Sequence, residues 1–305
     1  MRVGIIDLGT NTFNILIANI EKGKQFEVLL NTKSAVMLGQ EGLNNGFISD
    51  KAFTRAYGVL RDFSQLITEF KCEKVVAYGT SAIRDASNSS VFIKKISDDL
   101  NIIISPISGH QEAEFIYFGV KNAVNFSHEN YLILDIGGGS NELIIANQEG
   151  ILWKESFKLG GARLLEHFKP SDPISESTIN EVNQLLAQEL KPLTLALANY
   201  PVTKLIGSSG AFDSYAAMIH FKEKGAPISK SLPSYPISLE QFNDIYRKVI
   251  GSTRSERLLI TGLEALRVDT IVMASVFTQY ILAISKVNGI IQSSYSLKEG
   301  VATQF

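Results

Sequence analysis

The feature that most constrains the fold of this chain is an internal repeat that relates residue 7 to residue 135. Residues 7–19 read DLGTNTFNILIAN and residues 135–147 read DIGGGSNELIIAN, and the two segments align without a gap. Five of the 13 positions are identical and four more are close exchanges. Segments 79–85 and 207–213 are separated by the same offset, and each holds Gly-Thr/Ser-Ser followed by an Asp. Two matches in one register predict a duplicated domain.

Each half of the repeat has the same order of expected elements. A short apolar run ends at Asp7 or at Asp135, as is typical of a buried strand that opens into a glycine turn. Alternating apolar residues then predict further strands, and residues 113–124 and 179–190 have helical spacing. We therefore predict an α/β fold with a mixed sheet in each of two similar domains, 1–125 and 126–292, and a boundary in the polar stretch 125–130.

Composition excludes several classes of protein. The 305 residues suit two domains of ordinary size, and 45% apolar residues with only 8 prolines indicate compact cores. A net charge of -2 gives no field that would draw the chain onto nucleic acid or a membrane surface. Cys72 is the only cysteine, which excludes an internal disulfide and fits a cytoplasmic location. The apolar stretch 271–291 is interrupted by polar residues and predicts a buried helix.

The two glycine turns predict a phosphate site. Backbone N–H groups and hydroxyls that converge at such a turn form a nest for phosphate oxygens, and glycine lets the backbone come close. The alternative is a pair of ordinary hairpin turns. A further Gly/Ser nest is expected at 207–210. The predicted phosphate-binding residues are Gly9, Thr10, Asn11, Thr12, Arg84, Gly137, Gly138, Gly139, Ser140, Gly207, Ser208, Ser209 and Gly210.

Three carboxylates are predicted to hold a hydrated Mg²⁺ or another divalent cation. Asp7 and Asp135 stand at strand ends, and Mg²⁺ keeps several waters and uses few protein ligands. Glu142 lies two residues beyond Ser140, so on a strand it shares that residue's face and can add a third carboxylate. A solvated strand position is the alternative for Glu142.

Two further side chains are candidates for the chemistry. Arg84 has the planar fork that suits phosphate oxygens, although a salt bridge with Asp85 would also explain it. Ser108 and Gln111 match a capping box, which leaves Glu112 without a role in the cap. Glu112 is a plausible general base that positions a water, and the preference of Glu for the first helical turn is the competing explanation.

The motifs in this order resemble the exopolyphosphatases and guanosine pentaphosphate phosphohydrolases of the Ppx/GppA family. The resemblance covers nearly the whole chain. It rests on DLGTNT at 7–12, LGQEGL at 38–43, TSAIRDA at 80–86, the SG-x-x-EA pattern at 108–113, DIGGGSNEL at 135–143, LGGARL at 159–164, GSSGAFD at 207–213 and LKEGV at 297–301.

The resemblance implies two actin-like ATPase (ribonuclease H-like) domains with five-stranded sheets around a cleft, and a last helix, about 293–305, that packs on the first domain. It implies hydrolysis of a terminal phosphoanhydride bond, in inorganic polyphosphate or at the 5′ end of guanosine pentaphosphate. By motif match Glu112 is the base, Asp7, Asp135 and Glu142 are metal positions, and Arg84 binds phosphate. A homodimer is expected by family analogy alone.

Three positions depart from the family pattern. Gln111 replaces the first of two acidic residues, Asn141 replaces Thr in GGGSTE, and Asn14 stands where many members have Arg or His. The departure at Asn14 leaves nucleotide affinity open. Two other functions also stay open: a non-catalytic sensor of guanosine tetraphosphate or polyphosphate, and a kinase of the same fold.

Overall fold

The computed structural model describes residues 1–40, 42, 44–229 and 232–305. Glu41 and Leu43 of the LGQEGL motif lie outside the described residues. The chain divides into two compact units. Unit 1 comprises Met1–Gly119, Gly137–Gly139 and Ser296–Phe305, and unit 2 comprises Val120–Ile136 and Ser140–Tyr295. The limits 1–125 and 126–292 rest on sequence pattern and stay a prediction.

The sheet of unit 1 has the strand order β3-β2-β1-β4-β5. The pairs β1–β2 and β2–β3 are antiparallel, and β1–β4 and β4–β5 are parallel. Apolar residues such as Ile5, Ile15 and Ile17 are fully buried, which explains why these runs form central strands. The elements are β1 (Arg2–Leu8), β2 (Thr12–Asn19), β3 (Glu27–Ala35), α1 (Asp50–Glu69), β4 (Lys74–Gly79), α2 (Ser81–Asp85), α3 (Ser89–Leu100), β5 (Ile104–Pro106), α4 (Gly109–Ala123, which runs on into unit 2) and α12 (Leu297–Ala302).

The sheet of unit 2 repeats this order and adds one strand: β10-β11-β9-β6-β7-β8. The pairs β6–β7 and β7–β8 are antiparallel, β6–β9 and β9–β11 are parallel, and the additional β10 pairs with β11 antiparallel. The elements are β6 (Tyr131–Ile136), β7 (Asn141–Asn147), β8 (Gly150–Phe157), α5 (Gly161–Phe168), α6 (Glu176–Glu189), α7 (Lys191–Asn199), β9 (Lys204–Ser208), α8 (Ser209–Lys224), β10 (Ser234–Ile237), α9 (Leu239–Gly251), α10 (Arg254–Arg257), the 3-10 turn η1 (Ala265–Arg267), α11 (Thr270–Ser285) and β11 (Ile290–Ser293).

The two sheets share a detail that strand order alone does not require. The β2–β3 ladder shifts register between Ile17 and Ala18, and the β7–β8 ladder shifts between Ile145 and Ala146. The internal repeat aligns these two positions with each other, just as it aligns the two glycine turns. A register shift of this kind changes the local twist and direction of a strand, and it falls at the same place in both meanders.

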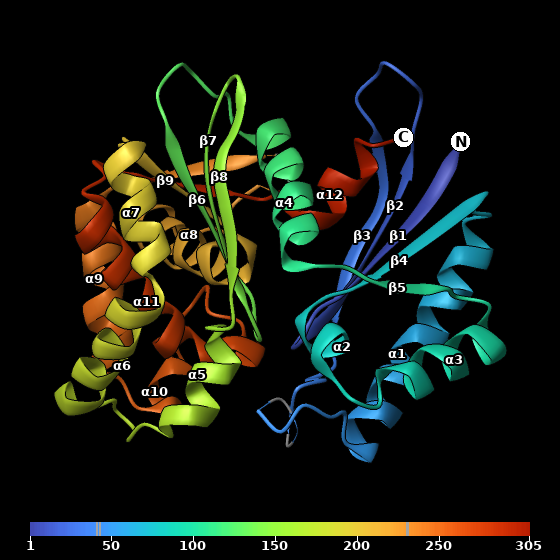
Figure 1. The fold of residues 1–305 in the computed structure, drawn as a ribbon, viewed down its shortest axis with the longest axis horizontal. Coiled ribbons are helices and arrows are strands. Elements are labelled where there is room, and N and C mark those ends of the chain that lie inside the picture. The colour runs from blue at the N-terminus through green and yellow to red at the C-terminus, as the bar shows by residue number, and fades with distance from the viewer. Residues whose placement is uncertain (41, 43, 230–231) are drawn as a thin grey trace. The chain divides into compact units, whose positions relative to one another are not determined.

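Helices cover both faces of the unit 1 sheet. In Figure 1, α1 and α3 lie on one side of it, and α12 packs against β1 and β2 on the other. The Glu299 side chain on α12 is fully buried. It accepts hydrogen bonds from the Ser296 N–H at 3.0 Å and from Asn31 Nδ2 on β3 at 3.3 Å, and Lys298 Nζ lies 2.9 Å away. A buried carboxylate needs such partners, and they fix α12 on the sheet.

The core of unit 2 is built around α11. Eight consecutive residues, 271–278, are buried, and the helix packs against α5, α6, α7, α8 and α9. The buried helix predicted within 271–291 is therefore confirmed up to Ser285, whereas the end of that stretch belongs to β11, which begins at Ile290. Among the described residues, no helix combines the length and the hydropathy that crossing a membrane requires.

Two glycines allow α12 to cross α4 closely. A Cβ atom at Gly300 would overlap the Phe115 carbonyl oxygen, and one at Gly119 would overlap the Ser296 carbonyl oxygen. Gly58, in the middle of α1, has no atom within 4 Å of the position of a Cβ. The two settings distinguish a glycine required by packing from one that only weakens a helix.

We expect Gly300→Ala to lower the free energy of unfolding by about 2 kcal/mol or more, because backbone atoms cannot move away from the new methyl group. Gly58→Ala is the matched control and should raise it by about 0.5–1 kcal/mol. Urea denaturation of both variants measures the difference. Equal effects of the two substitutions would contradict the close crossing.

Candidate active site

The turn between β1 and β2 carries the first set of predicted residues. Asp7 is half-buried on β1 and accepts a hydrogen bond from Asn14 Nδ2 at 2.9 Å. The Gly9 N–H donates to the Thr12 carbonyl at 3.1 Å. This bond closes the turn, so the N–H group of Gly9 serves to shape the turn. A side chain at Gly9 would press on that carbonyl oxygen, at 2.8 Å from a Cβ. Thr10 and Asn11 form the tip of the turn.

The hairpin of β6 and β7 in unit 2 carries two buried carboxylates. Asp135 and Glu142 are directly opposed in the antiparallel ladder, and their exposed fractions are 5% and 1%. Directly opposed residues point to the same face, with Cβ atoms about 5 Å apart. Ser209 Oγ donates to Asp135 at 2.7 Å, and Ser156 Oγ donates to Glu142 Oε1 at 2.7 Å. Gly137–Gly139 form the turn between the strands, and Ser140 is buried beside it.

The equivalent positions of the two hairpins differ in charge. Asp7 opposes Asn14 in unit 1, and Asp135 opposes Glu142 in unit 2. The register is the same, because the internal repeat aligns the first pair with the second. An amide next to a carboxylate can donate to it, whereas a second carboxylate repels it unless a cation or a proton intervenes. Of the two pairs, only the one in unit 2 consists of two acidic side chains.

The donor set of this pair fits Mg²⁺. Two carboxylates, with the remaining positions left to water and phosphate oxygens, are the ligands that this ion usually takes. Within the described parts of the chain, no group of three or more His, Cys, Asp or Glu side chains is placed to hold a metal. Two acidic ligands suit an ion that keeps much of its hydration, as Mg²⁺ does.

Arg84 and Glu112 of unit 1 form an ion pair. Arg84 Nη1 lies 3.0 Å from Glu112 Oε2 and also donates to the Ile107 carbonyl at 3.0 Å. Arg84 Nε lies 3.9 Å from Asp85, so the predicted alternative pairing is present but longer. Glu112 is 8% exposed, in the first turn of α4. The Ser108 and Gln111 capping box is formed as expected, and Glu112 takes no part in it.

The 207–210 segment is not a single loop. Gly207 and Ser208 end β9, and Ser208 is fully buried with its hydroxyl donated to the Tyr295 carbonyl. Ser209 begins α8 with a φ of 68°, in the left-handed region. The two serines therefore have different partners: the Ser208 hydroxyl binds the Tyr295 carbonyl, and the Ser209 hydroxyl binds Asp135.

The positively charged side chain of Arg267 lies beside this segment, and the sequence alone does not predict that position. A side chain at Gly210 would collide with the guanidinium of Arg267, which therefore lies directly against the start of α8. Arg267 belongs to the 3-10 turn η1 and pairs with Glu264 at 3.3 Å. No motif or spacing links residue 267 to residue 210, so only the folded chain identifies Arg267.

The α8 helix is held in the core by Tyr215. Its hydroxyl lies 3.1 Å from Ser275 Oγ on α11. Burial of the ring raises the pKa of Tyr215 to about 12, so the hydroxyl stays neutral at physiological pH. The position of Ser209, at the start of the same helix, is thereby tied to the core of unit 2.

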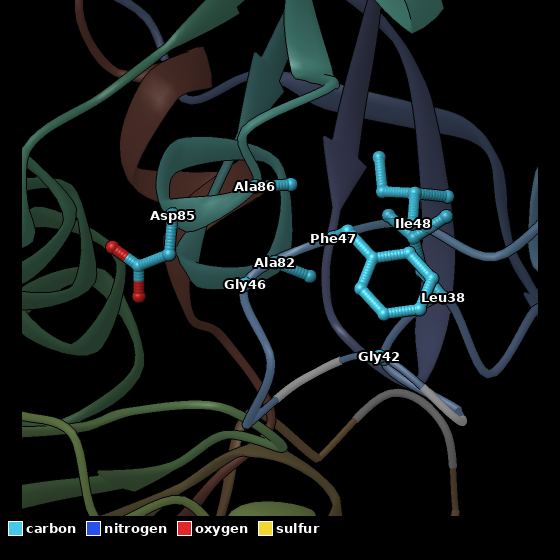
Figure 2. A pocket seen from close by; sticks show the side chains of 9 residues that line it. Leu38, Gly42, Gly46, Phe47, Ile48, Ala82, Asp85 and Ala86 are labelled. Carbon is cyan, nitrogen blue, oxygen red and sulfur yellow. The ribbon is translucent and has the colours of Figure 1, made fainter.

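A small apolar pocket lies next to α2 in unit 1. Figure 2 shows Leu38, Phe47, Ile48 and Ala86 around it, while the Asp85 carboxylate points away from these side chains. Ser81 Oγ donates to that carboxylate at 3.4 Å. The side chains of this lining are apolar apart from the Asp85 carboxylate, whose negative charge does not favour phosphate.

Comparison with known proteins decides the family. The sequence model of the Ppx/GppA phosphatase family matches residues 16–304 of this chain. This chain belongs to the Ppx/GppA phosphatase family. The resemblance inferred from the motifs is thus confirmed, and so is the predicted class of enzyme, a phosphate-releasing hydrolase.

Three relatives place the chain within the Ppx/GppA family. A solved exopolyphosphatase from Cytophaga hutchinsonii is 40% identical, with a TM-score of 0.97 over 100% of this chain and 97% of that one. A putative exopolyphosphatase of Haemophilus influenzae is 28% identical over 98% of this chain and 90% of its own length. A bifunctional 3-dehydroquinate synthase/phosphatase of Fusobacterium nucleatum is 28% identical over 91% of this chain, which spans 42% of that protein.

The predicted fold class, two duplicated actin-like domains with mixed sheets flanked by helices, is confirmed for this Ppx/GppA chain. The second sheet has six strands where five were expected. The reason is β10, which pairs with the outer side of β11 and has no counterpart beside β5.

We expect Ser209→Ala to destabilise the protein more than Ser209→Gly. Both variants lose the hydrogen bond to Asp135. Only the alanine variant still has a Cβ atom on a left-handed backbone, which costs about 1–2 kcal/mol of stability. Chemical denaturation of the two variants and of the wild type measures the difference. If alanine were as stable as glycine, the left-handed conformation at Ser209 would be wrong.

Proposed function

We propose that this Ppx/GppA chain hydrolyses the terminal phosphoanhydride bond of inorganic polyphosphate. The observation that carries the proposal is the 40% identity, over the whole chain, to the Cytophaga hutchinsonii exopolyphosphatase. The buried Glu112, held by Arg84, adds a residue with the chemistry that such a reaction needs. The 5′ phosphate of guanosine pentaphosphate presents the same bond and is a second substrate to test.

Glu112 is the proposed general base. Arg84 Nη1 donates to the Oε2 atom of its carboxylate at 3.0 Å, and the carboxylate is proposed to accept a proton from the attacking water. Because the same Nη1 atom also donates to the Ile107 carbonyl, the guanidinium has a fixed backbone anchor. This arrangement fixes the direction of the carboxylate before a substrate arrives, and such positioning is a main source of rate in phosphate transfer.

Phosphate oxygens are proposed to bind the turn residues Thr10–Thr12 and Gly137–Ser140, together with Ser209 and Arg84. Asp135 and Glu142 are the proposed ligands of Mg²⁺, and the metal role of Asp7 stays a prediction. The ion, when bound, neutralises charge on the phosphate oxygens.

We expect Glu112→Gln to lower kcat/KM for tripolyphosphate by about 100-fold or more, because an amide cannot accept the proton of the attacking water. Phosphate release measures the effect. Glu114→Gln is the matched control, since Glu114 is exposed on the same helix. Turnover of the Glu112 variant at the wild-type rate would remove Glu112 from the role of base.

We expect chelation of divalent cations to abolish phosphate release, and added Mg²⁺ to restore it. In Glu142→Gln one ligand loses its charge, so calorimetry should show Mn²⁺ or Mg²⁺ binding weakened by about tenfold or more, independently of catalysis. Glu149→Gln, in the turn after β7, is the control. Unchanged ion binding in the Glu142 variant would exclude the proposed pair.

The substrate is assigned by parallel phosphate-release assays with tripolyphosphate, long-chain polyphosphate and guanosine pentaphosphate. Release from polyphosphate supports the proposal. Release from guanosine pentaphosphate alone would replace it with a nucleotide phosphohydrolase, and tight binding without release from any of the three would indicate a sensor.

A further inference from the structure

The segment that follows β3, residues 36–40, is here called the strap. It contacts the β1–β2 turn through three backbone hydrogen bonds. The N–H groups of Val36 and Met37 both donate to the Asn11 carbonyl at 2.9 Å, and the Gly39 N–H donates to the Thr10 carbonyl at 3.3 Å. Both carbonyls at the tip of the turn therefore face the strap.

This contact fixes where the donors of the turn point. In a planar trans peptide the carbonyl and the N–H of the same group point in opposite directions. The Thr10 carbonyl shares its peptide group with the Asn11 N–H, and the Asn11 carbonyl shares its group with the Thr12 N–H. Since both carbonyls are held by the strap, these two N–H groups are directed away from it, as a nest for phosphate requires.

Arg55, on α1, holds the strap from its other side. Arg55 Nε donates to the Val36 carbonyl at 2.8 Å, and Nη2 donates to the Met37 carbonyl at 3.0 Å and to Gln40 Oε1 at 3.1 Å. The Val36 carbonyl shares its peptide group with the Met37 N–H, which is one of the donors to Asn11. A continuous path of hydrogen bonds thus runs from the guanidinium, through two peptide groups, to the Thr12 N–H.

The contact requires an unfavourable backbone conformation in the strap. Met37 has a φ of 49°, in the left-handed region. That conformation costs a residue with a Cβ atom about 1–2 kcal/mol. It is retained here because the N–H of Met37 is bound to Asn11 on one side and its carbonyl to Arg55 on the other.

We propose that Arg55 is a positioning residue of the phosphate site, which strengthens and aims the N–H donors of the β1–β2 turn through the strap without touching the substrate. A cation bound to a peptide carbonyl polarises that peptide and makes its N–H a stronger donor, and hydrogen bonds in series reinforce one another. The inference rests on the proposed function only in assigning phosphate to this turn.

Two substitutions separate this electrostatic role from a mechanical one. Arg55→Lys keeps the positive charge, and Arg55→Gln keeps an N–H donor at the place of Nε without the charge. If Arg55 only supported the strap mechanically, both variants would lose the same amount of affinity. If the charge of Arg55 polarises the peptide groups, the lysine variant should retain most of the affinity for tripolyphosphate. The glutamine variant should lose about tenfold, the size expected when a charged donor is replaced by a neutral one.

The test is calorimetric titration of tripolyphosphate into the wild type, the two Arg55 variants and Arg61→Gln, with thermal unfolding measured alongside. Arg61 is the control because it is 62% exposed on the same helix and pairs only with its neighbour Asp62 among the described residues. The expected order of affinity is wild type and Arg61→Gln, then Arg55→Lys, then Arg55→Gln.

Equal affinity of the lysine and glutamine variants, or no binding by the wild type, would overturn the inference. If Arg55→Gln does not fold, the double variant Arg55→Gln/Met37→Gly replaces it, because glycine adopts the left-handed backbone without cost. Phosphate release is assayed on the same samples. Binding in the expected order without release would refute the proposed hydrolysis of polyphosphate and leave the role of Arg55 standing.

Discussion

The register of two antiparallel hairpins is the constraint on which the rest of the structure depends. It places residue 7 opposite residue 14 and residue 135 opposite residue 142, on one face of each sheet. A slip of one residue would turn each pair into the core and bring apolar side chains into its place. The buried strands on either side, with residues such as Ile5 and Leu134 fully buried, make that slip costly, so the core of each unit determines which side chains meet at its turn.

Much of this arrangement could be read from the sequence. The strands, the glycine turns and the buried helix at 271–285 follow from period-two and continuous apolar patterns, and the internal repeat related the two halves. The motifs also identified the family. These features are local, and a local pattern is carried by neighbouring residues in the chain.

The remaining features depend on contacts between distant residues. The position of Arg267 beside Gly210, the bond between Asn14 and Asp7, and the links from Arg55 to the strap have no local signature. The Arg84–Glu112 pair joins residues 28 positions apart, and only the folded chain brings them together. The sixth strand of the second sheet was missed for a similar reason, because a short edge strand has few apolar residues to mark it.

The matching bulges have a consequence for the history of the chain. If the two halves descend from one ancestral segment, a bulge at the same place in both was present before the segment was duplicated, since two independent insertions would rarely fall at equivalent positions of the repeat. The residues opposite the two aspartates, in contrast, have diverged to Asn14 in one half and Glu142 in the other. On that premise the register shift is older than the duplication, whereas the difference in charge between Asn14 and Glu142 arose after it.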